Sequence, residues 1–170
     1  MTDFSKKYWN FWNIAGYTAL AMFFIADRLL KTAAVKQGYG GYMELVGGLL
    51  RFRLSPNSGL AFSINSGLPG LTWLISGVIL ALLIYLSYLI INKKNQRHLL
   101  LPLTFIIIGA ISNVLDRILF GAVIDYLDVA NLTVLNLSDV LITIGLIVLF
   151  IQQTTSNHAD THSEKTNAKG

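Results

Sequence analysis

Four long apolar blocks, separated by shorter polar stretches, set the pattern of this chain. They cover about residues 11–30, 69–91, 99–119 and 140–151. A transmembrane helix needs about 20 mostly apolar residues, so the first three blocks are long enough to cross a bilayer. The fourth reaches that length when its polar approach, residues 136–139, is included. The pattern predicts an all-α membrane protein with four transmembrane helices.

The segment between the first and second blocks, about residues 32–68, has a different character. It is rich in glycine and contains an alternation of apolar and basic side chains, Leu50-Arg51-Phe52-Arg53-Leu54. Alternation with period two favours strands and glycines favour turns, so we expect a small extracytoplasmic β-rich segment lying against the membrane surface. Residues 1–151 then form one integral membrane domain. Residues 152–170, rich in Thr, Ser, Asn and Lys, are expected to be a disordered cytoplasmic tail.

Basic residues indicate the orientation of the four helices. The short connection between the second and third blocks contains Lys93, Lys94 and Arg97 and no acid, and other basic residues precede the first block and follow the fourth. Because short basic loops stay on the cytoplasmic side, both termini are expected there. A cleavable signal peptide is the alternative for the first block, but Asp27-Arg28 interrupts its end and no cluster of small residues follows it cleanly.

Composition supports a membrane protein and excludes several kinds of chemistry. The chain has 170 residues, 54% of them hydrophobic and 13% charged, which exceeds the apolar content that a soluble core of this size needs. The absence of cysteine excludes disulfides, a thiol nucleophile and thiolate metal sites. The net charge of +4 is spread without a basic stripe, so we expect no nucleic acid partner. His158 and His162 have helical spacing but no third ligand, so neither a metal nor a cofactor is expected.

Acidic residues beside apolar stretches point to a functional site. Asp27, Asp116, Asp125, Asp128 and Asp139 all have such surroundings, where an unpaired charge is costly. The alternation of four helices places the first, second and last of these at the outer face. The loop after Asp125 is short enough to return it beside the start of the fourth helix at Asp139. Asp128 is the weaker candidate, since an exposed loop carboxylate explains it equally well.

Two carboxylates at this position predict acid–base chemistry. Mutual repulsion between Asp125 and Asp139 in a poorly solvated setting should leave one protonated and one ionised. The ionised member can take a proton from a water that attacks a peptide carbonyl, and the neutral member can protonate the leaving amine. This is the arrangement of aspartic proteases.

Several of the surrounding polar residues also have structural interpretations. Asn113, Asp116 and Arg117 share a helical face, and an Asp-Arg pair can simply anchor a helix end. Asn136 and Asp139 have the spacing of a helix cap.

Two further polar residues are also open to a structural interpretation. Asp27 and Lys31 have the spacing of a structural ion pair along a helix. Asn57, in Pro56-Asn57-Ser58-Gly59, has the sequence of a turn.

Five motifs in this order resemble those of the lipoprotein signal peptidases, also called signal peptidase II, which are bacterial aspartyl membrane proteases. The resemblance extends from Asp27 to Ile142. The motifs are Asp27-Arg28-Leu29-Leu30-Lys31, Asn57-Ser58-Gly59-Leu60-Ala61-Phe62, Gly109-Ala110-Ile111-Ser112-Asn113-Val114-Leu115-Asp116-Arg117, Val123-Ile124-Asp125-Tyr126 and Asn136-Leu137-Ser138-Asp139.

The resemblance implies roles for these residues. Asp125 and Asp139 would be the catalytic aspartates. The residues expected to bind the substrate are Asn57, Asn113, Arg117 and Asn136. Those expected to support the site are Asp27, Lys31, Gly59, Asp116 and Ser138.

The resemblance also implies the biology. The substrate would be a prolipoprotein bearing a diacylglyceryl group on its lipobox cysteine, cleaved on the N-terminal side of that cysteine. The expected location is the bacterial inner membrane, with the active site near the outer face. Membrane lipid and globomycin-like inhibitors are expected partners, and a monomer is expected because the sequence has no signature of self-association.

This chain departs from the family pattern at several positions. Arg28, Leu60, Ser112 and Ser138 stand where Gln, Ala, Gly and Ala are usual, and the interval from Asp125 to Asp139 is short and lacks a Phe-Pro element. A non-catalytic lipoprotein-binding paralogue is therefore one alternative. A proton-relay or transporter subunit is another, although its acids should lie nearer mid-span.

Overall fold

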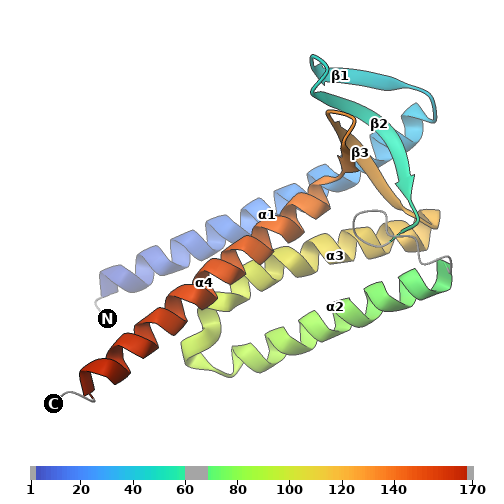
Figure 1. The fold of residues 1–170 in the computed structure, drawn as a ribbon. Coiled ribbons are helices and arrows are strands. Elements are labelled where there is room, and N and C mark those ends of the chain that lie inside the picture. The colour runs from blue at the N-terminus through green and yellow to red at the C-terminus, as the bar shows by residue number, and fades with distance from the viewer. Residues whose placement is uncertain (1–2, 60–68, 168–170) are drawn as a thin grey trace.

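The computed structural model describes residues 3–59 and 69–167 as five helices and four strands. The helices are α1 (Asp3–Gln37), α2 (Pro69–Ile91), the 3-10 helix η2 (Lys94–Leu99), α3 (Leu100–Phe120) and α4 (Leu137–Asn167). The strands are β1 (Tyr42–Val46), β2 (Leu50–Asn57), β3 (Val123–Val129) and β4 (Thr133–Leu135). Figure 1 shows the strands gathered at one end of the helices, while α1 begins, α4 ends and α2 turns into α3 at the other end.

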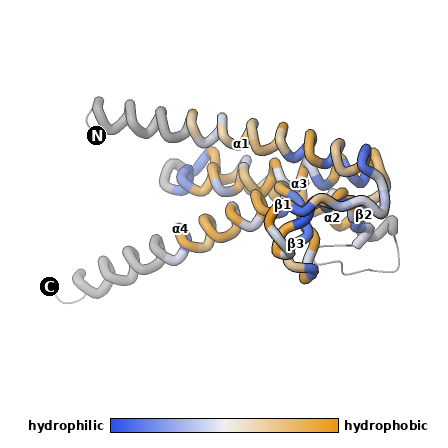
Figure 2. Tube along the Cα trace, turned by 90° about the horizontal axis from the view of Figure 1, so that it is seen from above, coloured by the Kyte–Doolittle hydropathy of each residue, from blue (hydrophilic) through white to orange (hydrophobic). Residues whose placement is uncertain are grey.

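Three helices in the described part of the chain are long and apolar enough to cross a membrane. These spans are Trp73–Ile91, Gln96–Phe120 and Leu137–Thr154, and Figure 2 shows their predominantly apolar character. Leu74, Leu82 and Ile147 are among the many apolar side chains that they expose. Such a surface is unfavourable in water and suits lipid. The mostly helical membrane fold is confirmed, while the crossing of the bilayer by α1 stays a prediction.

A four-stranded antiparallel sheet has the order β1-β2-β3-β4. The alternating run predicted as a strand lies in β2, which confirms that strand. The prediction was wrong in confining the sheet to the segment between the first two helices, because β3 and β4 lie between α3 and α4. The two aspartates of β3, Asp125 and Asp128, suggested a loop, yet its other residues are mostly β-branched or aromatic and favour strands.

Two glycines position β3 and the start of α4 relative to α3. Gly121 ends α3 with φ of 78° and donates its N–H to the carbonyl of Arg117 at 3.0 Å, so the chain turns directly into β3. Gly109 lies where α3 approaches α4, and a Cβ there would come within 2.6 Å of the carbonyl oxygen of Ser138. The absence of a side chain therefore lets the start of α4 lie against α3.

A small apolar core joins the sheet to α1. Phe52, Ile124 and Tyr126 pack with Ala34 of α1, and the rings of Phe52 and Tyr126 lie 5.6 Å apart between centroids. These contacts fix β3 against the C-terminal half of α1.

Helix α4 extends to Asn167 and so includes most of the segment 152–170. The sequence favours disorder there because the segment has almost nothing to bury. Its disorder, its cytoplasmic location and the grouping of residues 1–151 as one domain stay predictions.

Candidate active site

Asp125 and Asp139 meet through one asparagine at the sheet end of the helices. Asp125 lies in β3 and is 3% exposed, and Asp139 lies in the first turn of α4. Asn136 donates from Nδ2 to Asp125 Oδ1 at 2.7 Å and from its backbone N to Asp139 Oδ2 at 3.3 Å. Its Oδ1 accepts from the backbone N of Asp139 at 2.9 Å. The predicted helix cap is therefore present, and the same asparagine connects both carboxylates.

Two further asparagines donate to the remaining carboxylate oxygens. Asn57 Nδ2 donates to Asp125 Oδ2 at 3.1 Å, and Asn113 Nδ2 donates to Asp139 Oδ1 at 2.9 Å. Asn57 also forms the predicted turn, since its Oδ1 accepts from the backbone N of Gly59 at 3.0 Å. Every oxygen of the two carboxylates thus accepts a hydrogen bond from an N–H group.

Arg117 approaches the same carboxylates from α3. Its Nη2 donates to the carbonyl of Gly59 at 3.0 Å, its Nη1 contacts the carbonyl of Asn113 at 3.4 Å, and its charge acts on both Asp125 and Asp139. Its buried Nε has no hydrogen-bond partner among the described residues. The guanidinium therefore retains a donor beside the two acids.

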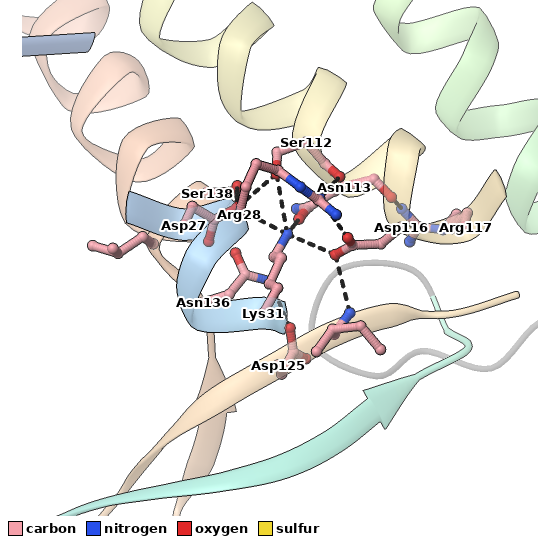
Figure 3. A network of polar contacts seen from close by, with 12 residues as sticks. Asp27, Arg28, Lys31, Ser112, Asn113, Asp116, Arg117, Asp125, Asn136 and Ser138 are labelled. Carbon is pink, nitrogen blue, oxygen red and sulfur yellow. Dashed lines mark hydrogen bonds and ion pairs between the residues drawn. The ribbon is translucent and has the colours of Figure 1, made fainter. Parts of the chain in front are cut away.

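Figure 3 shows a buried ionic network formed by residues of α1 and α3 close to Asp125. Lys31, fully buried in α1, pairs with Asp27 at 3.1 Å and with Asp116 of α3 at 2.6 Å. Arg28 also pairs with Asp116, at the Oδ1 of that carboxylate. The expected Asp27–Lys31 pair is present. Asp116, which could have paired with its neighbour Arg117, instead pairs with Arg28 and Lys31 of α1 and accepts from the backbone N of Ile124 at 3.1 Å.

Hydroxyl groups complete the environment of Asp27. Ser112 and Ser138 donate to Oδ2, and Tyr126 donates to Oδ1 at 2.9 Å. The Tyr126 oxygen also accepts from the backbone N of Leu137 at 3.1 Å. This hydroxyl therefore links α1, β3 and the start of α4 next to both Asp125 and Asp139.

The environment of Asp125 changes its protonation. Burial raises the pKa of Asp125 to about 7, and the neighbouring Asp139 adds to the rise, while the hydrogen bonds from Asn57 and Asn136 oppose it. This carboxyl therefore keeps its proton to a higher pH than an exposed aspartate does. Burial and the charge of Asp27 also raise the pKa of Tyr126, which stays a neutral donor.

Asp128 lies outside this arrangement. It pairs with Arg53 at 2.7 Å and accepts from the backbone N of Asn131 at 3.1 Å. The hydrogen bond from Arg53 lowers the pKa of Asp128, so this carboxylate has an ordinary structural role in the sheet.

The structure adds Tyr126, Arg28 and Ser112 to the residues selected from the sequence. Their sequence signal was weak, because a hydroxyl or guanidinium group within a strand or helix does not reveal a partner far away in the chain. Leu60, Ala61 and Phe62, which belong to the second motif, lie outside the described residues.

A family model and the related sequences agree on one family, and a solved structure has the same fold. A family model described as "Signal peptidase (SPase) II" matches residues 19–155. A protein of Clostridium tetani named lipoprotein signal peptidase is 35% identical over 133 residues, covering 75% of this chain and 84% of that protein. One of the same name from Microcystis aeruginosa is 35% identical over 153 residues, covering 87% and 93%. A solved structure described as a bacterial membrane enzyme has the same fold, with a TM-score of 0.72 at 24% identity over 84% of this chain and 89% of that one.

Proposed function

The chain belongs to the signal peptidase II family and is a protease of prolipoprotein signal peptides, and from this premise we propose that Asp125 and Asp139 form its catalytic pair. The observation that carries the proposal is Asn136, which hydrogen-bonds to both carboxylates from a single position. Two acids held by one residue are close enough to act on one water and one peptide bond.

The charges of the network support a shared proton. The described residues of the site include four carboxylates (Asp27, Asp116, Asp125 and Asp139) and three cations (Arg28, Lys31 and Arg117). With all of these groups charged, one negative charge is left over in a poorly solvated site. A single proton on the catalytic pair neutralises it, and the pair titrates as a unit.

The reaction follows from this protonation. The ionised carboxylate takes a proton from water as the oxygen attacks the scissile carbonyl, and the neutral carboxyl donates a hydrogen bond to the carbonyl oxygen. The neutral carboxyl then protonates the leaving amine. The free Nε of Arg117, with Asn57 and Asn113, is available to hold the peptide backbone near the pair.

We extend the proposal to the substrate and the membrane. A diacylglyceryl group on the cysteine keeps the prolipoprotein in the bilayer, so its scissile bond reaches acids near the outer interface, and cleavage occurs N-terminal to that cysteine. Helix α1 provides a fourth crossing, and both termini are cytoplasmic in the bacterial inner membrane. The basic loop near Lys93 lies at the helix end opposite the sheet (Figure 1), which supports this orientation. Globomycin-like peptides would compete for the same site, and the protein would work as a monomer.

The test is cleavage of a lipidated precursor by purified protein. Asp125→Asn and Asp139→Asn should each lower turnover by about 10²- to 10⁴-fold. Asp128→Asn is the matched control, because it makes the same substitution in β3 outside the site and should cleave like the wild type. Turnover near the wild-type rate by either site variant would refute the assignment.

The same assay separates the alternatives. An unlipidated precursor should be cleaved poorly, and globomycin should inhibit cleavage of the lipidated one. A paralogue that binds lipoproteins without catalysis would bind the precursor and leave it intact, both as the wild type and as either aspartate variant.

A further inference from the structure

The orientation of each asparagine amide at the site is set by an N–H group on its far side. The Oδ1 of Asn57 accepts from the backbone of Gly59, and that of Asn136 accepts from the backbone of Asp139. The Oδ1 of Asn113 instead accepts from Lys31 Nζ at 3.0 Å. Because each Oδ1 already accepts a hydrogen bond, the NH₂ group on the other side of the amide points toward a carboxylate.

Lys31 is thus the one side-chain donor among these three, and substitution can remove it. We infer that Lys31 is a positioning residue, which aims the Asn113 amide at Asp139 and contributes the positive charge that keeps one member of the catalytic pair ionised. This inference rests on the proposed function of the two aspartates.

The position of Lys31 supports both parts of the inference. Its ammonium is fully buried and contacts Asp27, Asp116, Ser112 Oγ at 3.3 Å and Asn113, so it cannot swing to another partner without leaving a buried carboxylate unpaired. Without this donor the Asn113 amide can rotate and present its oxygen to Asp139, and two acceptors facing each other repel unless a proton lies between them.

Charged groups lie around the catalytic pair on α1, α3, β3 and α4, while β2 contributes the neutral Asn57 to Asp125 and its Arg53 pairs with Asp128. Helix α1 contributes Asp27, Arg28 and Lys31, helix α3 contributes Asp116 and Arg117, and β3 and α4 contribute the pair itself. Among these cations, Lys31 is the one that contacts an asparagine side chain hydrogen-bonded to a catalytic aspartate. Loss of its charge makes removal of a proton from the pair less favourable.

The test is the pH profile of kcat/KM for cleavage of a lipidated precursor. Lys31→Met should lower kcat by about 10- to 100-fold with KM little changed, and should move the whole profile to higher pH by roughly one unit. Lys36→Met, an exposed lysine on the same helix, is the matched control and should leave rate and profile unchanged. A merely structural role would lower the folded fraction and leave the profile where it was.

A second variant keeps the test decisive if Lys31→Met does not fold. The double change Lys31→Met with Asp27→Asn removes one charge of each sign and keeps the buried cluster neutral. Because Asp27 lies beside the pair with the opposite charge, its loss offsets the loss of the Lys31 charge, and the profile should stay near that of the wild type. Asn113 still lacks its donor, so kcat should fall by about 10- to 100-fold with KM little changed in folded protein, verified by thermal unfolding in detergent. An unchanged kcat in a folded variant overturns the role of Lys31. Undiminished cleavage by Asp125→Asn or Asp139→Asn would instead overturn the proposed function.

Discussion

Helices α2 and α3 have similar lengths, 23 and 21 residues, yet they are used differently. In the apolar stretch of α2, 6% of the residues are buried inside the protein, whereas 33% are buried in the apolar stretch that includes α3. Helix α2 contains no acidic or basic residue, whereas the last turns of α3 bury Ser112, Asn113, Asp116 and Arg117. Hydrophobicity places both helices in lipid, but polar contacts determine where α3 packs. Substitutions in α3 should therefore be costly and equivalent ones in α2 nearly silent.

The largest loss of stability is expected from Asp116→Leu. This change removes the carboxylate that pairs with both Arg28 and Lys31, so Arg28 loses its ion-pair partner and Lys31 keeps only Asp27. The expected cost is about 3–5 kcal/mol of the free energy of unfolding, measured by denaturation in detergent. Leu82→Ala in α2 removes an exposed apolar side chain and is the control, expected to cost less than about 1 kcal/mol. Equal losses for the two variants would contradict the comparison.

A matched pair of glycines tests the packing of the two helices directly. Gly109→Ala would bring a Cβ within 2.6 Å of the Ser138 carbonyl oxygen and 2.8 Å of Ile142, pushing the start of α4 from α3. We expect a loss of about 1–3 kcal/mol in the free energy of unfolding together with reduced cleavage, because Asp139 follows Ser138. Gly77→Ala in α2 meets nothing within 4 Å and should stabilise the helix by about 0.5–1 kcal/mol. If Gly77→Ala lowered the stability and Gly109→Ala did not, the comparison of the two helices would be contradicted.

Removal of one hydroxyl should have a smaller effect. Tyr126→Phe keeps the ring that packs on Phe52 and deletes the oxygen shared by Asp27 and the backbone N of Leu137. Removing the donor to Asp27 Oδ1 and the acceptor of the Leu137 N–H should cost about 1–2 kcal/mol of the free energy of unfolding, measured by thermal unfolding. Tyr85→Phe in α2, whose ring is exposed, is the control. If Tyr126→Phe lowered the unfolding temperature as little as the control does, the Tyr126 hydroxyl would not hold the start of α4.

A change of pH should act on the sheet end and leave α2 unaffected, since α2 has no acid or base to titrate near neutrality. The folded pKa of Asp125 is raised from 3.8 to about 7. Its protonated form therefore contributes stability that is fully present below about pH 4 and is lost as pH rises toward 7. Cleavage that needs one proton on the pair should decline above about pH 7, and a kcat/KM profile rising steadily to pH 9 would contradict this.

The sequence predicted what depends on local pattern. The three apolar spans, the strand around Phe52, the cap formed by Asn136 and the Asp27–Lys31 pair all follow from spacing along one element. The meeting of Asp125 with Asp139 also followed, because a short connection joins them.

What the sequence missed depends on partners far apart in the chain. The pairing of Arg28 with Asp116 crosses 88 positions, and the hydrogen bond from Tyr126 to Asp27 crosses 99. Periodicity tells which face of a helix a side chain occupies, and it does not tell which other element covers that face. For the same reason β3 was taken for a loop, since its ladder with β2 is formed by residues near position 50.

The distribution of the site over the chain has a consequence for biosynthesis. One of the two acids is carried by the final helix, and the asparagine that joins them directly precedes that helix. A nascent chain that has emerged only as far as α3 therefore lacks one member of the proposed catalytic pair. If the pair acts as proposed, proteolytic competence arrives with α4, and a copy without α4 is harmless to neighbouring precursors.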